Sequence, residues 1–138
     1  MSIFKSSKKL IYMSANGLGA SIAAGGTSYL CAYLDGLLAT ERGMPISRPG
    51  AILMNLYFRI LSAQPPSGSL VVTVRNTGIS TPFILTIPAN SPGLVTYSET
   101  ILTYAIPNLG DSIGLMIVNN AAAGSTTIGA VSLDCLTD

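Results

Sequence analysis

The stretch Ser67–Gly93, SGSLVVTVRNTGISTPFILTIPANSPG, decides the fold class. Its two apolar runs, Leu70–Arg75 and Phe83–Pro88, are rich in β-branched residues, and each is bounded by Gly, Pro, Asn or Ser, as strands usually are. Between them, Asn76–Pro82 contains the Asn and Gly that tolerate the positive φ angles of a chain reversal. We therefore expect a β-hairpin.

The first run also predicts which face of the hairpin is buried, because side chains alternate between the two faces of a strand. Leu70, Val72 and Val74 share one face, which we expect in the core. The alternate row, which includes Thr73 and Arg75, is half polar and suits an outer or inter-subunit surface.

The same pattern continues along the rest of the chain. Turn-forming residues separate the apolar runs, and the one candidate for a helical turn is Leu34–Arg42, which Gly36 weakens. The expected strands are Lys9–Ala15, Ser28–Asp35, Ala51–Ser62, Ser69–Arg75, Pro82–Ile87, Val95–Ile106, Ser112–Asn119 and Thr127–Leu136. This pattern predicts an all-β protein, an antiparallel β-sandwich with the eight strands of a jelly roll.

The length of 138 residues fits one domain. Residues 1–26 are rich in Ser, Ala and Gly and have few bulky apolar side chains. They predict either an extended N-terminal arm that adds to a sheet edge of another copy, or a first strand followed by a loop. Residues 27–138 are assigned to the jelly-roll domain.

The composition favours self-association. Charged residues make up 9% of the chain, against about 25% in an ordinary globular protein, and the mean hydropathy is +0.54. So few ionic groups cover the surface of a monomer poorly, and contiguous apolar surface usually marks an interface. We expect a homo-oligomer or polymer, with contacts at Lys8, Leu10, Tyr12 and Leu18 of the N-terminal region.

Charge and hydropathy argue against nucleic-acid binding and against a membrane span. The net charge is +1 and the single basic cluster is Lys5, Lys8 and Lys9, whereas nucleic-acid binding needs a basic patch. The chargeless stretch Gly17–Leu34 is too rich in Gly, Ser and Thr for a membrane span. Met1–Ala20 lacks the sustained apolar region of a secretory signal. We expect an extracellular location, or a cell, spore or virion surface, without an evident signal peptide.

The residues offer little catalytic chemistry. The absence of histidine removes Ser-His-Asp and Cys-His catalysis and the commonest metal ligand. Two cysteines without histidine do not form a standard zinc site, and the glycine clusters fit no phosphate-binding motif. We therefore expect no enzyme, no metal and no cofactor. Tyrosines such as Tyr33 and Tyr57 are expected mostly in the core or at interface edges, in preference to a platform on which sugars stack.

Two features near the strands have structural interpretations. Gly110 and Asp111 predict a turn in which the Asp side chain caps the backbone before the next strand. Cys31 and Cys135 leave two alternatives open. A disulfide between them would add ~4–5 kcal/mol of stability in the chain-entropy model, whereas two buried free thiols would pack as small apolar groups.

Three short motifs of the chain match those of a known family of domains. The matching residues are Gly50, Leu53, Asn55 and Leu56; Thr73, Val74, Arg75, Gly78 and Thr81; and Gly110, Asp111, Ile113 and Leu115. With these residues the chain resembles the C1q/TNF-like jelly-roll domains of bacterial collagen-like spore-surface (exosporium) and phage-associated proteins. The resemblance covers about residues 48–136, without a Gly-X-Y collagen stalk, and implies a jelly roll that self-associates.

Two functions from different classes follow. The first is a structural self-assembling subunit of an extracellular filament, a surface layer or a virion, held together by apolar strand and sheet contacts between copies. The second is a trimeric C1q/TNF-like head domain that binds a surface glycan or receptor. Fibres or shells in solution would favour the first, and a discrete trimer the second.

Overall fold

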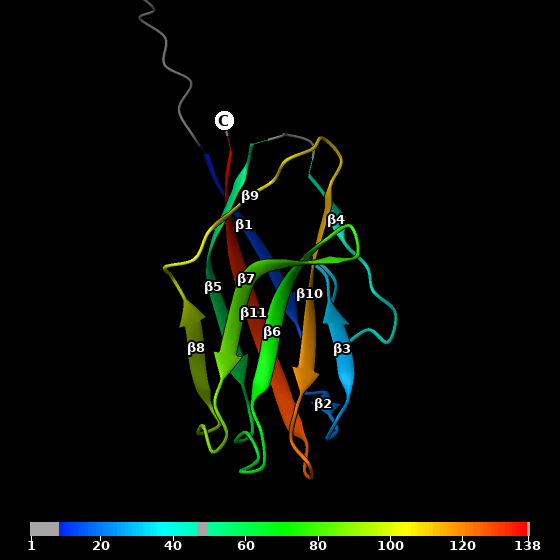
Figure 1. The fold of residues 1–138 in the computed structure, drawn as a ribbon, viewed down its shortest axis with the longest axis vertical. Coiled ribbons are helices and arrows are strands. Elements are labelled where there is room, and N and C mark those ends of the chain that lie inside the picture. Colours follow the sequence, from blue (N-terminus) through cyan, green and yellow to red (C-terminus); the bar gives the residue numbers. More distant parts are fainter. Residues whose placement is uncertain (1–8, 47–49, 138) are drawn as a thin grey trace, which may run out of the picture.

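The chain folds into two antiparallel β-sheets packed face to face (Figure 1). The computed structural model describes residues 9–46 and 50–137, with the backbone alone for Lys9, Ile11 and Tyr12. The first sheet contains, in spatial order, β1 (Lys9–Asn16), β11 (Thr126–Thr137), β5 (Ile52–Ile60) and β8 (Val95–Glu99). The second contains β3 (Thr27–Leu30), β10 (Ser112–Asn119), β6 (Leu70–Asn76) and β7 (Ile79–Ile87).

Three two-residue strands extend these sheets: β2 (Ser21–Ile22) and β9 (Tyr104–Ala105) in the first, and β4 (Met44–Pro45) in the second. Numbered one to eight in chain order, the longer strands run 1-8-3-6 in the first sheet and 2-7-4-5 in the second. Each sheet thus combines early and late strands, as in a jelly roll built from two Greek keys. The predicted all-β sandwich is confirmed. The predicted total of eight strands is wrong, because the described residues form eleven. The three additional strands have two residues each, which leave no periodic pattern in the sequence.

The β6–β7 hairpin has a tighter turn than the sequence predicts. Thr77 and Gly78 alone form the loop, and their φ angles of 49° and 79° are the two positive values of a type I′ turn. The expected connector Asn76–Pro82 is therefore too long, since β7 already begins at Ile79.

A bulge explains why Thr81 and Pro82 look like loop residues although they lie inside β7. The register between β6 and β7 shifts here, between Thr73 and Arg75. The Thr81 hydroxyl donates to the Val74 carbonyl oxygen (2.7 Å) and accepts the backbone N–H of Phe83 (3.2 Å). The side chain of Thr81 thus replaces ladder bonds next to a proline that has no N–H to donate.

The core lies between the sheets and follows the predicted alternation. Leu70, Val72 and Val74 are completely buried, as are Phe58 from the first sheet and Phe83 from the second. The opposite row of β6 is more enclosed than expected. Its member Thr73 is buried too, between neighbouring strands β7 and β10.

The N-terminal region forms part of the first sheet. Lys9–Asn16 pairs with β11 from Lys9 opposite Thr137 to Asn16 opposite Ala130. Residues 9–16 are thus a strand of the subunit's own first sheet. Residues 1–8 lie outside the described part of the chain.

The expected helical turn at Leu34–Arg42 is absent, and the predicted strand Ser28–Asp35 ends early, at Leu30. The backbone N–H groups of Tyr33 and Gly36 donate to the carbonyl oxygens of Ser14 (2.6 Å) and Asn16 (2.5 Å) in β1. These bonds, and not helical ones, fix the loop against the edge of the first sheet.

A buried polar cluster of Gln64, Asn119 and Thr126 holds the end of the sandwich that carries β2, at the bottom of Figure 1. Asn119 Nδ2 donates to the carbonyl oxygens of Ile22 (3.0 Å) and Gly124 (3.3 Å). Asn119 Oδ1 accepts from Gln64 Nε2 (2.9 Å) and from the Ala121 N–H (3.1 Å). The amide therefore makes four bonds, its usual full capacity.

Gln64 makes the other bonds of this cluster. Its Nε2 also donates to the Gly68 carbonyl oxygen of its own loop (2.9 Å), and its Oε1 accepts from the Thr126 hydroxyl of β11. Its backbone N–H donates to the Ser91 carbonyl oxygen (2.9 Å). Two buried side-chain amides thus join the loop after β5 to β10 and β11, and the Gln64 backbone joins it to the loop after β7.

Candidate interaction surfaces

The four residues predicted for assembly lie at different places. Lys8 is outside the described residues, and the Tyr12 backbone lies opposite Asp134 in the first sheet. Leu10 is 54% exposed on β1, and Leu18, just after β1, is 64% exposed. The structure thus places Leu10 and Leu18 at the surface, without showing what they contact.

Leu18 and Leu94 are both exposed and both have a left-handed backbone, with φ angles of 53° and 58°. This conformation costs a side chain with a Cβ about 1–2 kcal/mol, and Gly or Asn usually occupies it. Burial within the subunit does not compensate for the cost, because Leu94 is 69% exposed.

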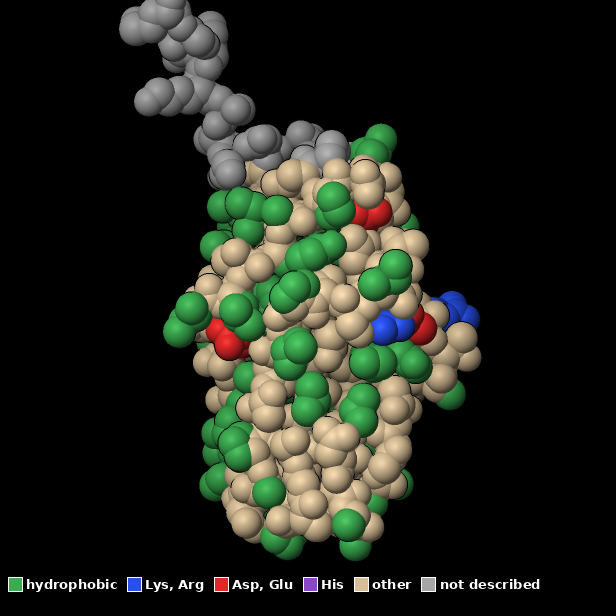
Figure 2. All heavy atoms as spheres, viewed as in Figure 1, with side chains coloured by type: hydrophobic (Ala, Val, Ile, Leu, Met, Phe, Trp, Pro, Cys, Tyr) green, Lys and Arg blue, Asp and Glu red, His purple; other side chains and the backbone are tan. Residues whose placement is uncertain are grey.

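Leu94 belongs to an apolar group at the edge of the first sheet, which we call the β8 patch: Leu94, Val95, Ile101 and Leu102. Ile101 is 88% exposed, the largest value among the exposed apolar side chains of the described residues. Figure 2 shows hydrophobic side chains gathered along the side of the molecule where Figure 1 places β8.

Glu99 shapes this patch and ends the strand. One of its carboxylate oxygens accepts the backbone N–H groups of Ile101 (2.9 Å) and Leu102 (3.0 Å). The predicted continuous strand Val95–Ile106 is therefore broken into β8 and β9. The bonds from Leu102 and Ile101 lower the pKa of the Glu99 carboxyl, so the cap is kept above this pKa and lost as the pH falls through it.

The four sheet edges differ in how open they are. Edge strand β7 carries a bulge and Pro82, devices that discourage pairing with another strand. At β1, the backbone oxygens of Ser14 and Asn16 are occupied by the Tyr33–Gly36 loop, and Tyr29 of β3 is bridged to Leu38. In the described residues, β8 pairs with β5 on one side only, and its other side has neither a bulge with a proline nor a covering loop.

Arg75 fastens the loop before β4 to the second sheet. Its Nε and Nη2 donate to the two carboxylate oxygens of Glu41 (2.7 and 3.1 Å), and its other bonds reach Ser80 Oγ (2.8 Å) and the Gly78 carbonyl oxygen (2.6 Å). The hydrogen bonds with Glu41 raise the pKa of the guanidinium. The predicted surface arginine thus has its donors used inside the subunit.

The predicted turn at Gly110 and Asp111 is present. Asp111 Oδ2 accepts the Asn108 N–H (3.1 Å) and Asn76 Nδ2 (3.0 Å), and the Gly110 backbone has a φ of 83°. Within the described residues, no three His, Cys, Asp or Glu side chains lie close enough together to hold a metal ion. That part of the chain also has no helix long and apolar enough to cross a membrane.

A hollow of about 450 Å³ lies on the outer face of the first sheet. The loop after β3 supplies Tyr33 and Asp35 to one wall, and β5 supplies Tyr57 and Arg59 to the other. The small residues Ser14, Ala130 and Ser132 are among those that line it between these walls. Tyr33 and Tyr57 are both exposed, so of the two expected places, the core and an interface edge, the core is excluded.

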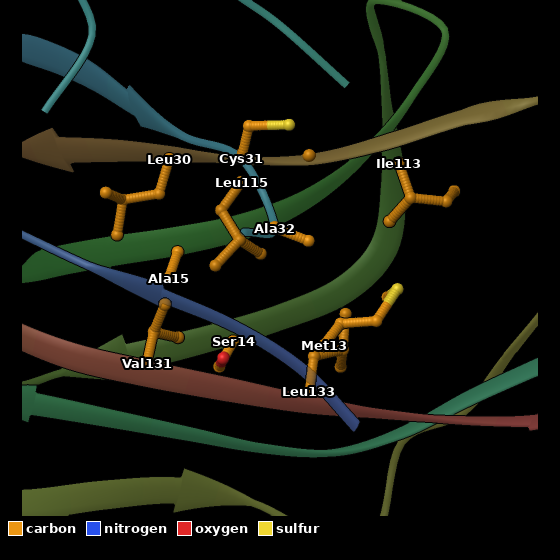
Figure 3. Close-up of a pocket in the computed structure, with 11 residues that line it drawn as sticks. Met13, Ser14, Ala15, Leu30, Cys31, Ala32, Ile113, Leu115, Val131 and Leu133 are labelled. Atoms are coloured by element: carbon orange, nitrogen blue, oxygen red, sulfur yellow. The ribbon is translucent and has the colours of Figure 1, made fainter. Parts of the chain in front are cut away.

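Both cysteines are buried and free, so the disulfide alternative is not found. Cys31 lines an apolar cavity of about 20 Å³ between the sheets. Figure 3 shows its side chain directed away from Met13 and Leu133 of the first sheet, the sheet to which Cys135 belongs. Burial raises the pKa of both thiols.

We expect both thiols to react slowly with a disulfide reagent such as DTNB in the native protein, because burial limits access and keeps them protonated. Unfolding in urea should release two reactive thiols per chain, the full cysteine content. Fast reaction of either thiol in the native state, or no reaction after unfolding without a reductant, would contradict this arrangement.

The comparisons with known proteins match the fold and not a family. No protein-family model and no curated protein matches the chain. Among solved structures, FlhE is 9% identical over 96% of this chain and 98% of its own, with a TM-score of 0.54. A chain from the structure of infectious bursal disease virus, Gx strain, is 13% identical over 93% of this chain, with a TM-score of 0.55. This chain spans 32% of that viral chain.

The sequence predictions missed Leu94, Ile101 and the hollow. Leu94 follows Gly93 and looks like the ordinary start of a strand. The preceding Gly93 packs against a distant segment, since a Cβ there would lie 2.7 Å from the Ser62 backbone, and this close approach exists only in the folded chain. The one local signal was Glu99, an acidic residue within an otherwise uncharged segment.

Proposed function

We propose that this protein is a structural subunit that assembles with copies of itself, as part of an extracellular filament, a surface layer or a virion. The observation that carries the proposal is Leu94, which is exposed in a left-handed backbone conformation at an open sheet edge. The likeness to a chain from a virus structure is compatible with this role. The C1q/TNF-like resemblance remains a prediction.

Leucine is an unfavourable residue at position 94 of an isolated subunit. Asn or Gly at this position would avoid the conformational cost and would expose less apolar surface to water. Leucine has neither advantage in an isolated subunit, since its side chain is 69% exposed. A contact outside the subunit that buries it would be worth about 1.5–3 kcal/mol and would offset the cost.

A second copy fits this edge by symmetry. Antiparallel pairing of β8 with β8 of another copy about Tyr97 brings Leu94 and Val95 of one chain to the end that carries Ile101 and Leu102 in the other. The β8 patch is therefore complementary to itself across a two-fold axis. In this pairing Glu99 lies opposite Val95, so the two carboxylates do not face each other.

A two-fold pair closes on itself, so a filament or shell needs a second contact. Leu18 offers one, because it combines exposure with a positive φ as Leu94 does and lies after β1, at the opposite edge of the first sheet. We assign pair formation to the β8 patch and extension to the surface around Leu18 and Leu10.

The variant Leu94→Asn tests the proposal. We expect the wild type to self-associate as its concentration rises. The variant should raise the dissociation constant of the pair by at least ~100-fold, because each pair loses two buried leucines. Every 1.4 kcal/mol of lost binding free energy raises this constant tenfold. The thermal stability of the dissociated variant should be unchanged or higher. Light scattering coupled to size exclusion and analytical ultracentrifugation measure association.

Leu109→Asn is the matched control, because Leu109 is also 69% exposed and its φ is not positive. This variant should associate as the wild type does. A wild type that stays monomeric at every concentration, or a Leu94→Asn protein that assembles normally, would refute the proposal. A discrete trimer without larger particles would favour the head-domain alternative.

A further inference from the structure

The hollow on the outer face of the first sheet has the features of a binding site, and its lining contains none of the four residues of the β8 patch, although Thr96 of β8 belongs to it. Its volume of about 450 Å³ falls in the usual range for small-molecule sites, ~300–1,000 Å³. It is lined by two tyrosines, by one positive and one negative side chain, and by small residues between them.

One polar side chain of this hollow takes part in folding, because Asn16 Oδ1 accepts the Leu18 N–H (2.9 Å). Arg59, Asp35 and Tyr57 differ from Asn16. Arg59 and Asp35 stand on opposite walls, and neither makes an ion pair or hydrogen bond with a described residue. The same holds for the Tyr57 hydroxyl. Arg75 shows the contrast, because Glu41, Ser80 and Gly78 occupy its donors. Donors and acceptors thus remain available on both sides of the hollow.

Tyr33 carries a second, independent signal. Its φ is 62°, a left-handed conformation that is an outlier for a bulky side chain, and its side chain is 62% exposed. Hydrogen bonds from the backbone of Tyr33 and Gly36 to β1 hold the loop in this shape. Asn or Gly would adopt it without strain, so the conformation alone does not account for a tyrosine.

We propose that this hollow binds a neutral saccharide. The tyrosine rings provide apolar faces against which the C–H faces of a sugar ring can pack. Arg59 can donate to two neighbouring hydroxyls and Asp35 can accept from two, which is the pairing that sugar diols offer. The small side chains of Ser14, Ala130 and Ser132 leave room for the ring.

The charge of the walls argues for a neutral ligand. One arginine and one aspartate leave the lining with no net charge. An anionic or cationic ligand would therefore be attracted by one wall and repelled by the other. Binding in the hollow would not depend on pairing through the β8 patch, because none of the four residues of that patch lines the hollow.

Saturation-transfer difference NMR with methyl glycosides of glucose, galactose, mannose and N-acetylglucosamine tests the proposal on the full chain. We expect at least one of them to bind at millimolar concentration. Arg59→Gln should weaken this binding at least tenfold, through lost hydroxyl contacts. Arg42→Gln, a matched loss of a guanidinium outside the hollow, should leave it unchanged.

Tyr33→Asn separates binding from folding. It should weaken glycoside binding at least tenfold while the protein stays folded, because Asn adopts the left-handed backbone conformation of this position readily. A lowered midpoint with intact binding would show a purely structural tyrosine and overturn the assignment. No signal from any of the four glycosides, or binding that survives Arg59→Gln, would also overturn it. Competition by an extended peptide alone would reassign the hollow to peptides.

Discussion

Asn119→Ala should lower the free energy of unfolding by roughly 4 kcal/mol or more, a large share of the ~5–15 kcal/mol that stabilises a typical domain. Asn119 is fully buried and makes four hydrogen bonds. Its removal takes a donor from the carbonyl oxygens of Ile22 and Gly124 and the acceptor from the Ala121 N–H and the Gln64 Nε2, and a buried group left unsatisfied costs ~1–3 kcal/mol.

Urea unfolding followed by circular dichroism measures this difference. Asn120→Ala is the matched control, because Asn120 is the neighbouring residue, has the same side chain and is exposed. We expect its effect to stay within ~0.5 kcal/mol, as for most surface substitutions. Similar losses for the two variants would mean that the buried amide cluster does not hold this end of the sandwich.

Gly114→Ala should destabilise the protein by about 3 kcal/mol, at the upper end of the usual range for overpacking. Gly114 lies in the middle of β10, opposite Arg75 of β6. A Cβ placed there would lie 2.4 Å from the Arg42 carbonyl oxygen, which is backbone and is held by the Glu41–Arg75 bonds beside it. The loop before β4 would have to move away from the sheet.

Gly129→Ala is the control for this variant. Gly129 also lies within a strand, β11, but a Cβ there would meet a methyl group of Leu61 at 3.1 Å, and a flexible side chain can move aside. We expect a loss below ~1 kcal/mol. Differential scanning calorimetry would compare the unfolding temperatures of the Gly114→Ala and Gly129→Ala variants. Equal temperatures would show that the loop at Arg42 moves away from the sheet at little energetic cost.

The sequence predicted the sandwich because its strands carry a local signal. Leu70, Val72 and Val74 alternate with more polar residues, and all three are fully buried. All eight predicted strands correspond to the eight longer strands of the two sheets. Register and bulges were not predictable, since the Thr81 bond to Val74 depends on which residues become neighbours after folding.

The interaction surfaces were harder to predict for the same reason. Leu18 was selected from its place in a weakly apolar N-terminal region, whereas its exposure follows from the path of the chain after β1. The left-handed conformations of Tyr33 and Leu94 arise from hydrogen bonds and close backbone approaches to distant segments. A linear pattern does not contain that information.

The pairing of β1 with β11 means that the first sheet is completed only at the end of biosynthesis. The two strands lie side by side, yet more than a hundred residues separate them along the chain. At ~5–20 residues per second, a ribosome needs roughly five to twenty seconds to deliver the second after the first. During that interval the nascent β1 lacks its strand partner, so completion of the first sheet waits for the last strand to emerge.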